Sequence, residues 1–359
     1  MLWGLLAFQL YAEDVVHLGS EGDVLKAPVK LAAVGNLDTG TIFTAKYSTL
    51  TLSLLDTIKK SASSGIVLLG DIIQSTEEKA WSQQLTVLST QLNGLPMLVL
   101  PGSQEYGQKE LTTFGKSFGE TKQQIGFNRT AGWQHLKIKD GKQRWTLLFL
   151  DSHKGKMGTK WKEQKRWLAK VLEGNTDEMV VFFVDSDVSL QHRSKASSEL
   201  MSQIYDATGL SQVRLVVFSG EAQTQAILPQ TTFDPLYLGC GGGGRKGKSL
   251  LRKNKEFSLH PMLDAFYLQA LEDNDISEKT KDMAYSRGKF EGKKSIYDAK
   301  EFPTYGYCSL AFDNGLKVSQ YHTLDGQVTK QSLLLAFTKV KGWTIPPKEE
   351  PQKNQTEPE

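Results

Sequence analysis

Five short apolar runs, most of which end at a glycine followed by polar residues, constrain the fold of this 359-residue chain more than any other feature. Short β-rich runs followed by such turns are typical of buried strands in an α/β sheet. In these sheets the strand ends deliver side chains to a shared site. The pattern therefore predicts an α/β fold with its functional residues at strand ends. The runs are LAAVGNLD (31–38), IVLLGD (66–71), MLVLPGSQEYG (97–107), MVVFFVDSD (179–187) and LVVFSGEAQ (215–223).

The segments between these runs predict helices that cover the sheet. Tyr47, Leu50, Leu54 and Ile58 form one apolar stripe at helical spacing. The sequence Ser75-Thr76-Glu77-Glu78 is a capping box, which predicts a helix that continues to about Leu92. The ranges expected to be helical are 44–62, 75–92, 161–172 and 196–208.

The remaining patterns indicate antiparallel strands. Asp140-Gly141 predicts a hairpin between 133–138 and 144–151. Asn314-Gly315 and Asp325-Gly326 separate three alternating strands between 306 and 336, which indicates a meander. An α/β first half and a β-rich end fit two stacked sheets with helices outside.

The polar residues at the run ends include no histidine. A two-metal hydrolase needs His, Asp and Asn at such positions. The six histidines of the chain lie elsewhere, and His153, which follows the apolar run TLLFLDS, is interpreted as a loop residue. The run ends offer Asn36, Asp71, Ser103, Gln104, Ser186, Glu221 and Gln223.

In order and spacing, these motifs resemble those of the calcineurin-like metallophosphoesterases over residues 29–325. The closest resemblance is to the tartrate-resistant (purple) acid phosphatase branch, which includes the glideosome-associated membrane-anchor proteins. It implies a four-layer αββα sandwich of two mixed β-sheets flanked by helices. Further matching motifs are FLDSHKG (149–155), the helix EQKRWLAKVL (163–172) and the late turn LGCGGGG (238–244). The domain is expected to span residues 13–340.

Compared with that family, the metal-binding positions are almost all substituted. Asn36 stands in place of a metal-binding Asp, with Asp38 beside it, and Gln74 replaces the iron-binding Tyr of the purple branch. Ser103 and Gln104 replace the ligand Asn and the catalytic His. Ser186 replaces one metal-binding His, and Glu221 and Gln223 replace two more. Among the positions that can be matched, the resemblance leaves Asp71 as the retained ligand.

These substitutions favour a catalytically inactive pseudo-phosphatase without a metal cofactor, which serves as a structural or protein-binding subunit of a larger complex. Ser and Gln are weak, neutral donors, whereas metal affinity requires several deprotonated ligands. The expected result is a metal-free polar network in which Asp71 accepts hydrogen bonds from Asn36, Ser103 or Gln104.

A hydrolase with a remodelled site is the alternative. Asp38, Asp71, Glu105, Asp187 and Glu221 would supply oxygen ligands for Mg²⁺, Mn²⁺ or Ca²⁺, while Zn and Fe are the other metals considered. Against this alternative, the amides of Gln104 and Gln223 cannot act as general acids.

A second alternative is a P-loop nucleotide binder. Residues 242–249 match G-x-x-x-x-G-K-S, with Gly242, Gly247, Lys248 and Ser249 at the fixed positions. A P-loop normally opens a parallel α/β domain, but here a basic segment and the antiparallel meander follow. The context therefore favours a glycine-rich turn.

Charge and hydropathy limit the partners. The net charge of +3 gives no support to nucleic acid as a partner, but Lys and Arg are concentrated in residues 245–300. This basic region is either a solvated insertion or a contact for an acidic partner or lipid headgroups. No stretch of 18 apolar residues predicts a transmembrane helix.

Three features bear on the cellular compartment. Residues 1–12 have the apolar composition of a signal peptide, although without a basic start, and Asn128 lies in a glycosylation sequon. Cys240 and Cys308 either form one disulfide or remain as two buried thiols. The secretory pathway or another membrane-bounded compartment is therefore expected. The Pro- and Glu-rich residues 341–359 are expected to form a disordered tail.

Overall fold

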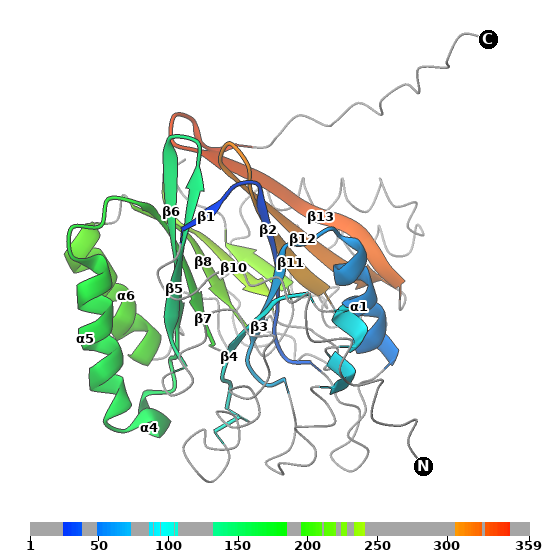
Figure 1. Ribbon diagram of the computed structural model, residues 1–359, viewed down its shortest axis with the longest axis horizontal. Coiled ribbons are helices and arrows are strands. Elements are labelled where there is room, and N and C mark those ends of the chain that lie inside the picture. Colours follow the sequence, from blue (N-terminus) through cyan, green and yellow to red (C-terminus); the bar gives the residue numbers. More distant parts are fainter. Residues whose placement is uncertain are drawn as a thin grey trace, which may run out of the picture.

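The computed structural model places its strands in two mixed sheets that stack face to face (Figure 1). It describes residues 24–37, 49–72, 86–88, 90–93, 95–103, 105–106, 132–184, 195–209, 212–219, 224–227, 233–240, 306–324 and 327–344. The first sheet has the order β1 (Val24–Lys26), β5 (Gln134–Asp140), β6 (Gln143–Leu150), β7 (Glu178–Phe183), β8 (Val213–Phe218), β10 (Leu236–Cys240) and β9 (Thr224–Ile227). The second has the order β14 (Gly342–Thr344), β13 (Gln327–Thr338), β12 (Leu316–Leu324), β11 (Gly306–Phe312), β2 (Val29–Val34), β3 (Gly65–Leu69) and β4 (Met97–Leu100).

Each sheet has a parallel part that ends at the candidate site. Strands β6, β7, β8 and β10 are parallel neighbours in the first sheet, and β2, β3 and β4 are parallel neighbours in the second. Strands β11 to β14 form the expected antiparallel meander, which joins the parallel part through the β2–β11 pair. Both sheets are therefore mixed.

Helices form the outer layers. In Figure 1, α5 (Lys160–Leu172) and α6 (Lys195–Thr208) lie outside the first sheet, and α1 (Thr49–Lys60) lies outside the second. The short α4 (Lys154–Met157) precedes α5. The α1 stripe is buried at Leu54 and Ile58, as its spacing predicts. None of the described helices is long and apolar enough to span a bilayer.

Large apolar side chains fill the space between the sheets. Trp145 on β6 packs edge-on against Phe312 on β11, with ring centroids 5.4 Å apart, and all three of Trp145, Phe149 and Phe312 are fully buried. Burying one such side chain contributes about 1.5–3 kcal/mol. The Cys240–Cys308 disulfide also connects the sheets, because it joins β10 to β11.

The predicted αββα architecture is confirmed, with differences at the ends of the sheets. The short edge strands β1 and β9 had no recognisable sequence pattern. Residues 341–344, which had been assigned to the tail, contain β14, because Trp343 is buried against Phe337 and its indole N–H donates to the Asp234 carbonyl at 3.1 Å. Residues 1–12 and 345–359 lie outside the described residues.

Candidate functional site at the strand ends

The ends of the parallel strands from both sheets meet at one place. The Gly35 N–H donates to the Cys240 carbonyl at 2.9 Å, which joins the ends of β2 and β10. The Asn36 N–H donates to the Gly70 carbonyl at 3.1 Å, at the end of β3. A Cβ on Gly70 would lie 2.6 Å from both the Gly102 Cα and the Val184 Cγ1, so only glycine permits this approach.

Two of the polar strand-end residues adopt a left-handed backbone conformation. Asn36 has φ of 54° and Asp71 has φ of 49°. Asn and Asp tolerate this region better than other residues with a side chain, but glycine adopts it without cost. The backbone therefore turns sharply at these two positions and holds the strand ends in place.

Asp71 and Ser103 form the contact predicted for a metal-free network. The Ser103 hydroxyl donates to the Asp71 carboxylate, at 3.2 Å from Oδ1 and 3.5 Å from Oδ2. Gly102 packs directly against Asp71, since a Cβ there would lie 2.5 Å from Asp71 Oδ1. The retained carboxylate thus has a hydroxyl donor from the neighbouring strand end.

Glu105 binds the backbone of the strand ends. Its carboxylate accepts hydrogen bonds from the N–H groups of Asp71 at 2.8 Å, Ile72 at 2.7 Å and Gly102 at 2.6 Å. Burial and the negative charge of Asp71 raise the pKa of Glu105 to about 7, although these three hydrogen bonds lower it. In the hydrolase alternative Glu105 was a candidate metal ligand, but here both of its oxygens accept from backbone amides.

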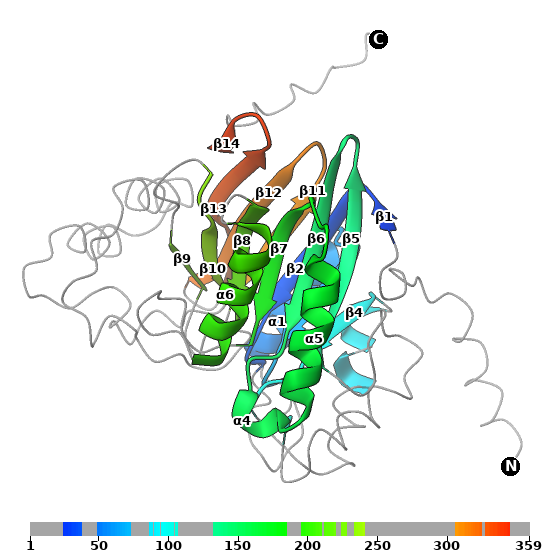
Figure 2. The same ribbon diagram turned by 90° about the vertical axis from the view of Figure 1, so that its left-hand side faces the viewer.

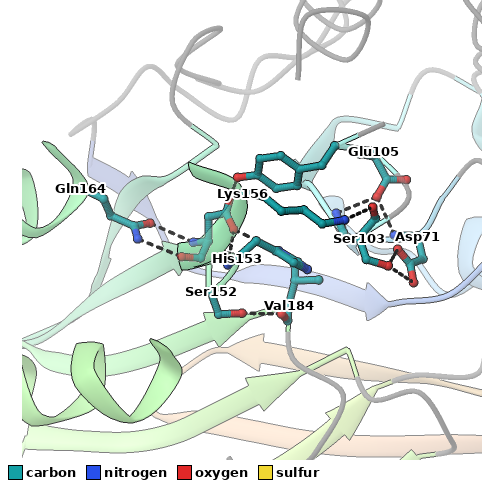
Figure 3. A network of polar contacts seen from close by, with 11 residues as sticks. Asp71, Ser103, Glu105, Ser152, His153, Lys156, Gln164 and Val184 are labelled. Atoms are coloured by element: carbon teal, nitrogen blue, oxygen red, sulfur yellow. Dashed lines mark hydrogen bonds and ion pairs between the residues drawn. The ribbon is translucent and has the colours of Figure 1, made fainter. Parts of the chain in front are cut away.

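A second buried carboxylate, Asp151, is held from all sides (Figure 3). It accepts a hydrogen bond from the Tyr106 hydroxyl and one from the His153 N–H at 2.8 Å, and its Oδ1 lies 3.1 Å from His153 Nδ1. The Gln164 amide on α5 forms two hydrogen bonds with the Asp151 backbone, accepting from N–H and donating to C=O at 2.9 Å each. The adjacent Ser152 hydroxyl donates to the Val184 carbonyl at the end of β7.

Charged groups from the α4 segment face the strand ends. Burial lowers the pKa of His153, but the hydrogen bond to Asp151 and the charges of Asp151 and Asp71 outweigh it, so the pKa is raised. The Lys156 ammonium donates to the Ser103 carbonyl at 2.9 Å and lies 5.9 Å from the centre of the Tyr106 ring. Figure 3 shows the Lys156 side chain extending toward Ser103. A permanent cation is therefore fixed beside the Asp71–Ser103 pair.

Sequence reasoning anticipated part of this arrangement. The structure brings together Asn36, Asp71 and Ser103, and it joins Cys240 and Cys308 in a disulfide. The roles of Tyr106, Asp151 and Lys156 were not anticipated, although FLDSHKG and the helix containing Gln164 had been noted as motifs. The candidate residues outside the described part of the chain are Asp38, Gln74, Gln104, Asn128, Ser186, Asp187, Glu221, Gln223, Gly242, Gly247, Lys248 and Ser249, as well as the basic region 245–300.

Comparison with solved structures gives the fold a precedent. Purple acid phosphatase PPD1 from yellow lupin (Lupinus luteus) seeds is similar with a TM-score of 0.51 and 11% sequence identity, covering 88% of this chain and 55% of that protein. The protein TT1561 of Thermus thermophilus aligns with a TM-score of 0.39 and 8% identity, covering 61% of this chain and 92% of that protein. No family model and no curated protein sequence matches this chain. The likeness therefore concerns the fold, and this chain spans about half the length of the lupin enzyme.

The donors described at the strand ends do not fit the metal centre that a purple acid phosphatase fold implies. Such centres need several imidazole or carboxylate donors that converge on the ions. Asn36 offers an amide, Ser103 offers a hydroxyl that donates to Asp71, and Glu105 is directed at backbone amides. Within the described ranges, no three His, Cys, Asp or Glu side chains are grouped to hold a metal ion. We therefore assign no reaction step to a metal here.

Proposed function

We propose that this chain is a catalytically inactive metallophosphoesterase-like protein that acts as a structural or protein-binding subunit of a larger assembly. The observation that carries the proposal is the hydrogen bond from Ser103 to Asp71. A carboxylate in a metal centre must direct its lone pairs at the ion, whereas this one accepts a proton donor from the neighbouring strand end. The resemblance to glideosome-associated membrane-anchor proteins adds the expectation of a role within a complex.

The electrostatics of the site support the same proposal. Metal ions would normally neutralise carboxylates gathered at strand ends, and unpaired buried ions cost several kcal/mol each. Here Lys156 supplies a positive charge at the Ser103 carbonyl, and backbone amides stabilise Glu105. A divalent cation would have to displace these contacts and approach a fixed ammonium group.

The direct test is metal content together with hydrolysis. The purified protein should contain substoichiometric Fe, Zn and Mn by elemental analysis, and it should not hydrolyse p-nitrophenyl phosphate above the buffer rate with any of these metals added. Metal-stimulated turnover that disappears in Asp71→Asn would refute the proposal.

A second test restores one ligand. Asn36→Asp places a second carboxylate beside Asp71 and should lower the melting temperature, because like charges repel without a metal to bridge them. Added Mn²⁺ or Zn²⁺ should leave that melting temperature unchanged. A metal-dependent rise would mean that the strand ends still form a metal site.

A metal-dependent phosphoesterase with a remodelled site is the second candidate, and His153 is the observation that favours it. Its Nδ1 lies 3.1 Å from the buried Asp151 carboxylate, which is the arrangement that often orients a metal-binding histidine through its other nitrogen. Calorimetric titration with Zn²⁺ or Mn²⁺ separates the two candidates. Binding that is lost in both His153→Ala and Asp71→Asn would favour the hydrolase.

We also propose a secretory or other oxidising, membrane-bounded compartment. The buried Cys240–Cys308 disulfide supports it, because such bonds form and persist where thiols are oxidised. Mass spectrometry of protein from its native source should find these cysteines resistant to alkylation without reductant and Asn128 carrying a glycan. Alkylation of both thiols in the native extract would contradict the assignment.

A further inference from the structure

One edge of the first sheet is free of any helix in the described part of the chain. Figure 2 shows α5 and α6 in front of the first sheet, with β5 and β1 beside α5 and no described helix over them. The ring of His135 on β5 lies 5.8 Å from the ring of Trp167 on α5, which fixes the helix next to this edge. The outer face of β1 and β5 is thus open beside α5.

Basic side chains form a row across this open face. Lys26 on β1 is paired with Lys139 on β5, and Lys139 is paired with Arg144 on β6. Their neighbours Ile138 and Trp145 point into the core between the sheets, so the alternation of strand side chains places the row on the outside. All three basic residues are exposed. Like charges directly opposite each other on neighbouring strands destabilise a sheet.

The outer side of α5 carries a second row. Lys162, Arg166 and Lys170 are spaced four residues apart and are all exposed. Like charges at this spacing destabilise a helix. Glu163 and Glu173 are the acidic residues on the exposed side of the same helix. None of the basic side chains in the two rows forms an ion pair within the residues that the structure describes.

We propose that this basic sheet-edge surface, formed by Lys26, Lys137, Lys139, Arg144, Arg166 and Lys170, binds an extended acidic segment of a partner protein. The surface is separate from the strand-end site and from the basic region 245–300. The proposal adds a place and a partner chemistry to the binding role proposed above, on which it rests. The uncompensated repulsion within the rows is relieved when carboxylates lie between them.

The shape of the surface favours a narrow partner over a membrane. The α5 layer stands above the strands it packs on, so the two rows lie at different levels. A flat anionic bilayer would contact the helix row and leave the strand row out of reach. An extended peptide can lie on β1 and β5 beside the helix and contact both rows.

Nucleic-acid binding and protection of a sheet edge each account for less of this surface. Single-stranded nucleic acid binds on exposed aromatic rings, but Trp167 is half-buried against His135 and Val24 is the exposed large apolar residue in this part of the described chain. Lysine on an edge strand also protects against pairing with other sheets. That reason applies to Lys26, but Lys139 and Arg144 lie on strands that have a neighbour on each side.

Fluorescence anisotropy with a labelled Glu- and Asp-rich peptide of about twelve residues tests the proposal. The full chain should bind with an affinity that falls when NaCl is raised from about 50 to about 200 mM, since salt screens these charges. The variant Lys26→Glu/Lys139→Glu/Arg144→Glu should bind at least about tenfold more weakly. Lys26→Gln/Lys139→Gln/Arg144→Gln should also bind more weakly while melting at or above the temperature of the unmodified protein, because it removes the repulsion.

The control carries the same change in charge on other surfaces. Lys59→Glu/Lys317→Glu/Lys341→Glu alters exposed lysines on α1, on β12 and in the turn before β14, and it should keep affinity within about twofold. Equal losses in both triple variants, unchanged binding in the sheet-edge variants, or tighter binding to phosphatidylserine vesicles or oligo-dT than to the peptide would each overturn the proposal. Such a failure is distinguishable from failure of the proposed function, whose tests measure metal content and hydrolysis.

Discussion

Asn36 and Asp71 hold a backbone conformation that their side chains do not favour. Non-glycine residues in the left-handed region persist only where surrounding contacts enforce them, and they occur often at functional sites. Here the enforcing contacts are the Asn36 N–H to Gly70 carbonyl bond and the amides of Asp71 and Ile72 on Glu105. The backbone shape of a strand-end site is thus maintained by hydrogen bonds of the protein itself.

Substitution at Asp71 should separate backbone strain from side-chain contact. Asp71→Ala loses the Ser103 hydrogen bond and places alanine at φ of 49°. Asp71→Gly loses the same bond but accepts that φ freely, so it should be more stable than Asp71→Ala by about 1 kcal/mol. Urea unfolding of both variants measures the difference. Equal stabilities would show that the left-handed backbone carries no strain here.

Glu105 should give the protein a pH-dependent stability. Its pKa is raised from 4.5 to about 7 by burial first and by the charge of Asp71 second. The folded state therefore holds this proton at pH values where the unfolded state has released it. As the pH rises from about 4.5 to about 7 this group lowers the free energy of unfolding, by an amount on the order of 3 kcal/mol, and above pH 7 its effect is constant.

Urea titrations at pH 5, 6, 7 and 8 should detect this slope. Glu105→Gln has no titrating carboxyl group and should lose the part of the slope that lies below pH 7. Glu163→Gln, at an exposed position on α5, is the matched control and should keep it. A wild-type slope retained in Glu105→Gln would assign the effect to another group.

At the scale of elements, α5 is attached to the first sheet through the loop after β6. Gln164 is fully buried, and its amide forms two hydrogen bonds with the Asp151 backbone. Asp151 then holds Tyr106 from the loop after β4. One glutamine on a helix thereby positions strand ends of both sheets.

Gln164→Ala should be clearly destabilising. It leaves the buried N–H and C=O of Asp151 without these partners, and each unsatisfied group costs about 1–3 kcal/mol. Lys170→Ala changes an exposed residue of the same helix and should alter stability by less than about 0.5 kcal/mol. Hydrogen exchange at the Asp151 amide should accelerate in the first variant only. Unchanged exchange there would mean that the loop is held by other contacts.

The elements were predictable where the sequence pattern is strong and local. The burial of β3 and β7 on both faces appears in IVLLGD and MVVFFVDSD as continuous apolar runs, and α5 has a regular apolar stripe. The three-residue strand β1 is too short to show a period and depends on pairing with β5. Its position is set by tertiary contacts, which a local pattern does not encode.

The site was predictable only in part for a similar reason. The Asp71–Ser103 contact follows from motif order, because neighbouring parallel strands bring their ends together. Glu105 appeared in the sequence as one more acidic residue near a strand end, and its direction toward backbone amides depends on the turn after β4. The Lys156 contact with Ser103 crosses 53 residues and leaves no periodic trace.

At the scale of the whole molecule, the two sheets are tied together at both ends. Far from the site, Asp140 at the β5–β6 turn accepts hydrogen bonds from the N–H groups of Asn314 at 2.8 Å and Gly315 at 2.6 Å, in the β11–β12 turn. At the site end, the buried Cys240–Cys308 disulfide joins β10 to β11. The Cys240 carbonyl also accepts the Gly35 N–H, so the disulfide lies next to the strand ends.

Removal of the disulfide should lower the stability of the whole domain. The two cysteines are separated by 68 residues, and closing a loop of that length in the unfolded chain corresponds to about 4 kcal/mol in the chain-entropy model. Cys240→Ala/Cys308→Ala should therefore unfold at lower urea, with a loss of about 2–4 kcal/mol. Because both cysteines are fully buried, reductant under native conditions should leave the unmodified protein folded and its disulfide intact, and reduction should begin only as urea unfolds the chain. Urea titrations with and without dithiothreitol, followed by alkylation and mass spectrometry, measure both effects. A double variant as stable as the unmodified protein would show that side-chain packing, and not this bond, holds the two sheets together at the site.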